Sequence, residues 1–327
     1  SLQRFNVDDV VHYTLAYLHD NPSHERYVVR EFAECFRNTY VTHLSIWNDL
    51  ISSMAFQKKH IDFFSAFFKV CSETIILKDL ATPIRQLLAQ TEPIETMFLV
   101  RAHLSKYMAT QSLKTFCRES SFAMLFLSEY GQHLAQPQFV QFSQHLDAAI
   151  LGPLRESMAI SSSSGASLDP PLLFASAEAV LLEILRLPFT NDFKAFMQMY
   201  RSELRSFLQR QSEPNLHLVE DPGDILLHLE EVRKLEEKYF RSLIFLYIVN
   251  PFLTTHYVKT DNRSAAIALS RVLQSLANAE EGELLSSHDP HSVALHLFCQ
   301  KNLPVITGFL YNLSADSTSS SSGLSAR

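Results

Sequence analysis

Residues 229–246 read LEEVRKLEEKYFRSLIFL, and this stretch decides the fold class. Its apolar residues recur at spacings of three and four, at Leu229, Val232, Leu235, Tyr239, Leu243 and Leu246. That spacing puts them on one face of a helix, while charged residues such as Glu230 and Lys234 fill the opposite face. The stretch therefore predicts an amphipathic helix of about five turns that buries its apolar face.

The helical period recurs in two further segments. One helix face in 61–71 would carry Ile61, Phe64, Phe67, Phe68 and Cys71. A helix over 264–278 would point inward Ile267, Val272, Leu273 and Leu276. The sequence has no strand alternation and no internal repeat, and it contains 24 Phe but only 7 Gly. Few glycines disfavour tight turns and glycine-rich nucleotide-binding loops, so we expect an all-α fold, a single elongated helical bundle.

Three segments interrupt the helical pattern. Residues 160–171 contain five serines, a glycine and two prolines, which predicts a flexible loop. Ser212-Glu213-Pro214 and Asp221-Pro222-Gly223-Asp224 bracket a second connection, in which Asp224 is expected to cap the next helix. The Ser-rich residues 316–327 predict a disordered tail. None of these segments is typical of a linker between independent cores, so we expect one domain over residues 1–315.

Charge, cysteines and apolar runs argue against several classes of protein. The net charge of −7 disfavours a nucleic-acid binder, which usually has a basic excess. The 4 cysteines lie far apart without a CxxC pair, which indicates reduced core thiols in a cytoplasmic protein. The longest apolar run, 242–253, has about 12 residues, whereas a membrane span needs about 20. No signal-peptide pattern opens the chain, so we expect no secretion and no membrane span.

Catalytic and metal-binding patterns are sparse. His288-Asp289-Pro290-His291 and His296 match no standard ligand spacing, and a turn before a helix explains them equally well. The sequence lacks HExxH, GxSxG and a phosphate-binding loop. We therefore expect no metal, no cofactor and no catalytic centre of the chain's own.

Three blocks of sequence are more informative. Residues 96–106 read TMFLVRAHLSK, residues 245–251 read FLYIVNP, and residues 270–278 read SRVLQSLAN. In this order they resemble the GTPase-activating domain of the Ras GAP family, in its neurofibromin-like form. The family patterns are T-L-F-R-x-N-S-L-x-x-K, F-L-R-F-I-N/C-P-A and S-K-[VI]-L-Q-x-[IL]-A-N. The resemblance covers a matched core of about residues 45–285, and its third block is the most specific.

The residues that match the family patterns are spread over all three blocks. They are Thr96, Phe98 and Lys106, then Phe245, Leu246, Asn250 and Pro251, and finally Ser270, Leu273, Gln274, Ala277 and Asn278. Arg271 replaces a lysine of the family, and residues 189–200 resemble a helix start with Asp192 and Lys194 at its charged places. The resemblance implies a groove that receives a GTP-loaded small GTPase. The implied partner-binding residues are Phe98, Leu99, Lys106, Lys194, Asn250, Pro251, Arg271, Gln274 and Asn278.

In the family, the partner carries out the hydrolysis and the activator inserts an arginine beside the γ-phosphate. The planar guanidinium stabilises the negative charge on the phosphoryl oxygens and raises the rate by about 10³- to 10⁵-fold. This chain departs from the pattern, because Leu99 stands at the finger position and Arg101 follows two residues later. Arg101 is therefore the candidate displaced finger, on an extended loop before a helix. Tyr247 stands where the family has the arginine that braces the finger loop, and tyrosine carries no positive charge.

Three functions remain open on these residues. The first is a Ras GAP-like domain that binds a GTP-loaded Ras-type GTPase and stimulates its hydrolysis. The second is a degenerate GAP-like scaffold that binds the GTPase without activating it. The third is a helical protein-interaction scaffold unrelated to GTPases. In the first two the chain regulates a partner and is not itself an enzyme, and membrane recruitment would come through that partner or through flanking domains.

A locally basic groove would support both GTPase hypotheses, because Ras-type switch regions are acidic and positive charge would steer their approach. The candidate residues for such a groove are Arg101, Lys106, Lys194, Arg201, Arg205 and Arg271.

Overall fold

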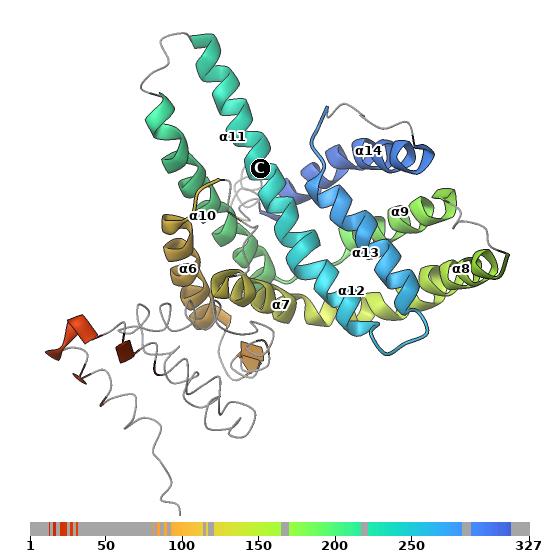
Figure 1. Ribbon diagram of the computed structural model, residues 1–327, viewed down its shortest axis with the longest axis horizontal. Coiled ribbons are helices and arrows are strands. Elements are labelled where there is room, and N and C mark those ends of the chain that lie inside the picture. Colours follow the sequence, from red (N-terminus) through yellow and green to blue (C-terminus); the bar gives the residue numbers. More distant parts are fainter. Residues whose placement is uncertain are drawn as a thin grey trace, which may run out of the picture. The chain divides into compact units, whose positions relative to one another are not determined.

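A computed structural model describes most of the chain after residue 92. Described are residues 93–113, 116, 121–164, 170–216, 222–282 and 289–314, with single residues and short pieces in 13–31 and 81–89. The side chains of 22, 93–95, 122, 162–164, 213–216 and 222–228 are not described. Every regular element in the described part is a helix, which confirms the all-α class there (Figure 1). The predicted helix over 61–71 and the predicted tail 316–327 lie outside the described residues.

The chain divides into two compact units, Ser1–His133 and Leu134–Arg327. In the first unit, α6 (Pro93–Thr110) buries Val100, Leu104 and Met108, which are spaced by four residues and so share one helix face. The helix α7 (Phe122–Leu146) contains the boundary between the units, and its first turns bury Phe126 and Leu127. The prediction of one domain over residues 1–315 stays a prediction.

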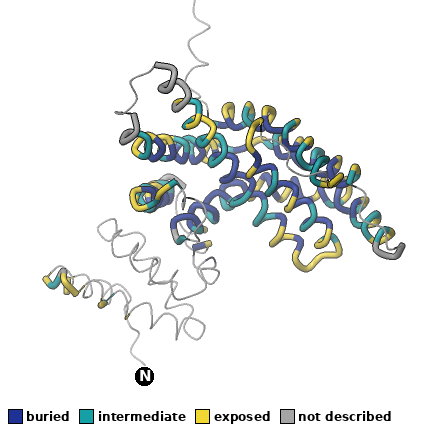
Figure 2. Tube along the Cα trace, turned by 45° about the horizontal axis from the view of Figure 1, so that its top comes forward, coloured by how far each residue is buried: buried dark blue, intermediate teal, exposed yellow. Residues whose placement is uncertain are grey.

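The second unit is a bundle arranged around one central helix. Its α-helices are α8 (Gly152–Ser164), α9 (Pro170–Arg186), α10 (Asn191–Leu216), α11 (Pro222–Ser242), α12 (Asn250–His256), α13 (Arg263–Asn278) and α14 (Pro290–Leu313). Two π-helical turns, η3 (Asp147–Leu151) and η4 (Leu243–Val249), complete it. The central helix is α13, which contacts α8, α9, α11, α12, α14 and η4 (Figure 1). Buried positions follow the inner faces of these helices (Figure 2).

The helix predicted over 264–278 is confirmed as α13, within one residue at its start. Val272, Leu273 and Leu276 are buried as predicted, whereas Ile267 is only half-buried. Each fully buried leucine contributes about 1.5–3 kcal/mol of hydrophobic stabilisation. The alternation of small residues such as Ala265 and Ala266 with leucines lets the neighbouring helices approach α13 on several sides.

The predicted loop over 160–171 is wrong at both ends. The helix α8 runs through the four serines to Ser164, and α9 begins at Pro170. Serine is only mildly unfavourable in a helix, and proline is well tolerated in a first helical turn. The second predicted connection is also shorter, because α10 continues through Pro214 to Leu216 and α11 begins at Pro222. Asp224 therefore lies in the first turn of α11 and is not its cap.

The amphipathic pattern of 229–246 is confirmed as a helix but only partly as a buried face. Leu243 is buried, but Leu229 is 55% exposed, and Val232, Leu235 and Tyr239 are half-buried. Phe240, outside the predicted face, is buried and stacks on Tyr200 of α10. The period gives the direction of each side chain, but it does not tell how far along α11 a neighbouring helix extends.

Two helices pass through a π-helical turn directly before a proline. In η3, the backbone N–H of Gly152 donates to the carbonyl of Asp147, and Pro153 follows. In η4, the N–H of Asn250 donates to the carbonyl of Phe245, and Pro251 follows. Proline offers no N–H and its ring crowds the carbonyl four residues earlier. The wider π turn lets the chain continue in helical form through Pro251.

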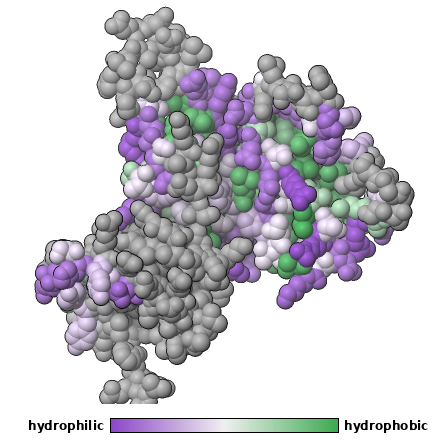
Figure 3. All heavy atoms as spheres, viewed as in Figure 1, coloured by the Kyte–Doolittle hydropathy of each residue, from purple (hydrophilic) through white to green (hydrophobic). Residues whose placement is uncertain are grey.

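Hydrophilic side chains cover much of the described surface, with hydrophobic areas between them (Figure 3). Among the described residues, no helix combines the length and the apolar character that a bilayer crossing requires.

Candidate partner-binding surface

The second and third matched blocks lie side by side in the second unit. Block two forms η4 and the start of α12, block three forms most of α13, and α13 contacts both η4 and α12. The hydroxyl of Ser270 donates a hydrogen bond to the side-chain oxygen of Asn250, which joins the two blocks directly. Ser270 is buried, so this bond holds the half-buried Asn250 in a fixed position at the edge of α13.

The matched polar residues of α13 lie on its outer face. Arg271 and Asn278 are exposed and Gln274 is half-buried, at a spacing of three and four residues that aligns them on one side. Arg271 forms no ion pair with any described residue. We define the α12–α13 surface as Asn250, Pro251, Arg271, Gln274 and Asn278. It is a mildly basic surface, with hydrogen-bond donors and acceptors and no carboxylate of its own.

An aromatic cluster supports the α12 side of this surface. Phe252, next to Pro251, lies 4.6 Å from Phe139 and 6.4 Å from Phe142, measured between ring centroids. His256 also stacks on Phe252, at 5.1 Å between ring centroids. Because rings of α7 and α12 interlock here, the position of Pro251 is set by packing and not by the short α12 alone.

The first matched block forms a helix and not the loop that the sequence predicted. Residues 96–106 belong to α6, whereas the sequence predicted an extended loop around Arg101. Thr96 is buried, Phe98 is 55% exposed, and Leu99 is only 3% exposed, inside the core of the first unit. Arg101 and Lys106 are exposed on the same helix. A buried leucine at the finger position cannot reach a bound nucleotide, so only Arg101 remains as a candidate finger in this block.

A histidine that the sequence analysis did not single out lies in the same block. His103 is buried and packs edge-on against Phe126 at 5.9 Å between ring centroids. Burial, with a smaller contribution from the charge of Lys106, lowers the pKa of His103 to about 4. The imidazole is therefore neutral near pH 7 and belongs to the core of the first unit.

The remaining predicted site residues lie within regular helical elements. Tyr247 is half-buried within η4, and its neighbour Phe245 is fully buried. Lys194 is exposed in the first turn of α10, where its backbone N–H donates to the carbonyl of Thr190. Phe98, Leu99, Lys106 and Arg101 belong to the first unit, and the other predicted site residues belong to the second.

Two arginines of the predicted basic groove are already paired inside the protein. Arg201 Nε lies 2.5 Å and Arg205 Nε lies 2.9 Å from the carboxylate of Glu236 on α11. Arg201 also donates to the hydroxyl of Ser314 at 2.6 Å and lies 4.4 Å from the ring of Tyr311. These contacts fasten α10 to α11 and to the end of α14, so Arg201 and Arg205 do not form a free basic patch.

The histidine-rich turn near 288 has a structural explanation in its described part. Asp289 caps α14, because its carboxylate accepts hydrogen bonds from the backbone N–H of Ser292 at 2.8 Å and from its hydroxyl at 3.0 Å. His288 lies outside the described residues. In the described part of the chain, no three His, Cys, Asp or Glu side chains are grouped as a metal site would require. Cys299, the one described cysteine, is buried.

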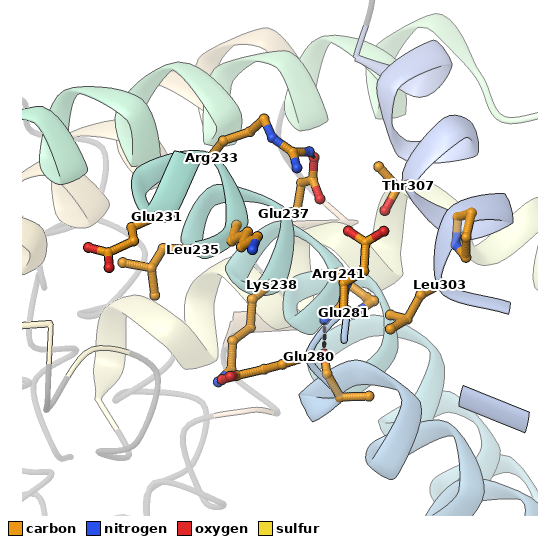
Figure 4. A pocket seen from close by; sticks show the side chains of 13 residues that line it. Glu231, Arg233, Leu235, Glu237, Lys238, Arg241, Glu280, Glu281, Leu303 and Thr307 are labelled. Carbon is orange, nitrogen blue, oxygen red and sulfur yellow. Dashed lines mark hydrogen bonds and ion pairs between the residues drawn. The ribbon is translucent and has the colours of Figure 1, made fainter. Parts of the chain in front are cut away.

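Sequence reasoning also missed Arg241, which is buried at the end of α11. A lone arginine in an apolar stretch gives no periodic signal, and its neighbours in space come from α13 and α14. Figure 4 shows the pocket that it lines, together with the ion pairs around it.

Comparison of this chain with protein-family models, with curated proteins and with solved structures gives no match.

Proposed function

We propose that this chain binds a GTP-loaded Ras-type small GTPase through the α12–α13 surface and provides little or no catalytic arginine. The main support is the hydrogen bond between Ser270 and Asn250, which joins the two most complete matched blocks. We infer that Asn250, Arg271 and Asn278 form one contact surface along this helix pair. Exposed basic and amide side chains of this kind suit an acidic switch region.

The binding-only form of the hypothesis is favoured by the first block. Leu99 occupies the finger position and is buried in α6, and Tyr247 occupies the bracing position without a charge. Catalytic groups that act as a unit lose most of their effect when one member is missing. Two missing members would remove nearly all of the about 10³- to 10⁵-fold acceleration that a complete finger gives.

A second candidate is GTPase activation by Arg101, and one observation favours it. Arg101 is exposed on α6, so its guanidinium can reach a partner without a change in the core. An arginine on a regular helix is less free to enter a nucleotide site than one on a loop. We therefore rank activation below binding.

The binding proposal is tested with a panel of Ras-type GTPases, each loaded with GDP or with a non-hydrolysable GTP analogue. We expect tighter binding to the GTP-analogue form of at least one member. Arg271→Glu should weaken that binding at least tenfold by reversing a charge at the centre of the surface. Arg186→Glu is the matched control, because Arg186 is an exposed arginine on α9 and lies outside the surface.

Equal affinity for both nucleotide states throughout the panel would overturn the proposal, and no binding to any member would leave the chain as a helical scaffold unrelated to GTPases. Phosphate release from the same panel separates the two GTPase hypotheses. Acceleration that Arg101→Ala abolishes, with binding unchanged, would establish activation in place of binding only.

A further inference from the structure

Arg241 is a buried cation that forms no ion pair with any described residue. The residue is 4% exposed, and its Nε and Nη2 atoms donate to the carbonyls of Ala277 (3.2 Å) and Ala279 (2.5 Å). The carboxylates that act on it electrostatically have other partners, since Glu237 pairs with Arg233 and Glu280 pairs with Lys238. Buried charges in proteins are normally paired, so a buried guanidinium without a carboxylate is unusual.

A cavity of about 570 Å³ opens beside this guanidinium (Figure 4). It lies between α11, α14 and the turn after α13, and its apolar lining comes from Leu235, Ala279, Leu303 and Pro304. A guanidinium has five N–H groups, so donors remain after the two carbonyls are satisfied. Thr307 of α14 adds a hydroxyl to the same lining.

The charges of the cavity wall select for the kind of anion that fits. Four carboxylates line it, those of Glu231, Glu237, Glu280 and Glu281, and their charge is balanced by Arg241 together with Arg233, Lys234 and Lys238. A wall without net charge compensates a multiply charged anion such as phosphate poorly. A single carboxylate carries one charge and matches the planar fork of an arginine with two parallel hydrogen bonds. The apolar part of the lining, in turn, favours a ligand whose carboxylate is attached to an apolar group.

We propose that this cavity binds a carboxylate attached to a compact apolar group, with the carboxylate on Arg241 and the apolar group against Leu303 and Pro304. Its volume falls within the range of small-molecule sites. The same chemistry occurs in a free carboxylic acid and at the C-terminus of a peptide that ends in an apolar residue. The proposal concerns the second unit alone and does not depend on GTPase binding.

The test uses four probes in calorimetric titrations of the full chain. N-acetyl-leucine is compared with its uncharged amide, and a tetrapeptide that ends in leucine is compared with its C-terminally amidated form. We expect at least one free acid to bind about tenfold or more tightly than its amide, as a charge-assisted hydrogen-bond pair implies. Tighter binding of the peptide would identify a chain terminus, and tighter binding of the small acid a free metabolite-like ligand.

Equal binding of acid and amide, or no binding of any probe at about 10 mM, would overturn the proposal, because even a millimolar Kd gives near-saturation there. Inorganic phosphate is titrated in parallel. Stronger binding of phosphate than of the acids would also overturn it.

Two test variants and one control can show whether the carboxylate binds in this cavity. Thr307→Phe fills the cavity from α14 without touching Arg241 and should lower the affinity for the free acid at least tenfold. Val305→Phe is the matched control, since Val305 is exposed on the same helix and does not line the cavity. Arg241→Gln keeps N–H donors for the carbonyls of Ala277 and Ala279 but removes the charge, so the preference for acid over amide should disappear. Circular dichroism checks folding, and if Arg241→Gln fails to fold, wild-type affinity in Thr307→Phe still refutes the proposal.

Discussion

The helix α6 contains the first matched block and α13 contains the third. The two helices differ in which of their matched residues are buried and which are exposed. In α13 the apolar positions Leu273 and Ala277 are fully buried, while Arg271 and Asn278 are exposed. In α6 the position at which the Ras GAP pattern has an arginine is the buried Leu99. The difference teaches that a sequence match preserves a surface only where its polar positions fall on the outer face of the folded helix.

The largest change in stability is expected at Leu99 of α6, the position at which the Ras GAP pattern has its finger arginine. Leu99→Arg should destabilise the first unit by about 3–5 kcal/mol, because it places an unpaired charge in the core. Phe98→Arg is the matched control, since the Phe98 side chain is 55% exposed, and this substitution should change stability by less than about 0.5 kcal/mol. Urea unfolding measures both. A Leu99→Arg variant with wild-type stability and faster phosphate release from a partner would contradict the buried position of residue 99.

A smaller effect should appear when the pH is lowered. The folded-state pKa of His103, about 4, lies below its ordinary value of 6.5, so folding favours the neutral imidazole. Its contribution is complete above pH 6.5 and is lost as the pH falls toward 4, with about 2 kcal/mol lost at pH 5. The helix α13 contains no Asp, Glu or His, so it offers no comparable group.

Hydrogen exchange at pH 7.5 and pH 5 can measure the two helices separately. Protection of α6 should fall more than protection of α13, and His103→Gln should remove most of the pH-dependent difference. Equal loss of protection in both helices, unaltered by the substitution, would show that His103 is not responsible.

An effect of about 1 kcal/mol is expected inside the α12–α13 surface. Ser270→Ala removes the donor to Asn250 and leaves the amide oxygen unsatisfied at a half-buried place. Ser275→Ala is the control on the same helix, because its hydroxyl bonds only to the backbone of Arg271. A double-mutant cycle with Asn250→Ala measures the pair itself. A coupling energy near zero would mean that the two blocks are held together by apolar packing alone.

The smallest effect concerns Arg271 in the absence of a partner. Arg271→Ala should change the free energy of unfolding by less than about 0.5 kcal/mol, since the side chain is exposed and unpaired among the described residues. Thermal unfolding of the isolated chain measures it. A loss above 1 kcal/mol would assign Arg271 a role in folding and would weaken its use as evidence for a binding surface.

Sequence alone predicted the fold class and the clearest helix, because α13 is amphipathic along its whole length and has neighbouring helices over most of its apolar positions. It predicted less about α11, where Leu229 fits the period but is exposed. It placed breaks at serines and at Pro214, because turn preferences are local and weak compared with the packing of a continuing helix.

The candidate site was predictable to a similar degree. Residues of the second and third blocks were expected together, and the link between Asn250 and Ser270 agrees with that expectation. The pairing of Arg201 and Arg205 with Glu236 could not be foreseen, because these residues lie more than thirty positions apart in sequence. Arg241 was missed for the same reason, since its partners are carbonyls at the end of another helix.

The π-helical turn η4 has a consequence for any variant with a changed length. A π turn holds one residue more than an α turn, so deleting one position between Leu243 and Val249 would return the backbone to α-helical spacing. The ring of Pro251 would then crowd the carbonyl four residues earlier, which the wider turn avoids. An inserted residue would instead turn α11 by about 100° relative to α12. Insertions and deletions should therefore be poorly tolerated at this joint, even where single substitutions are accepted.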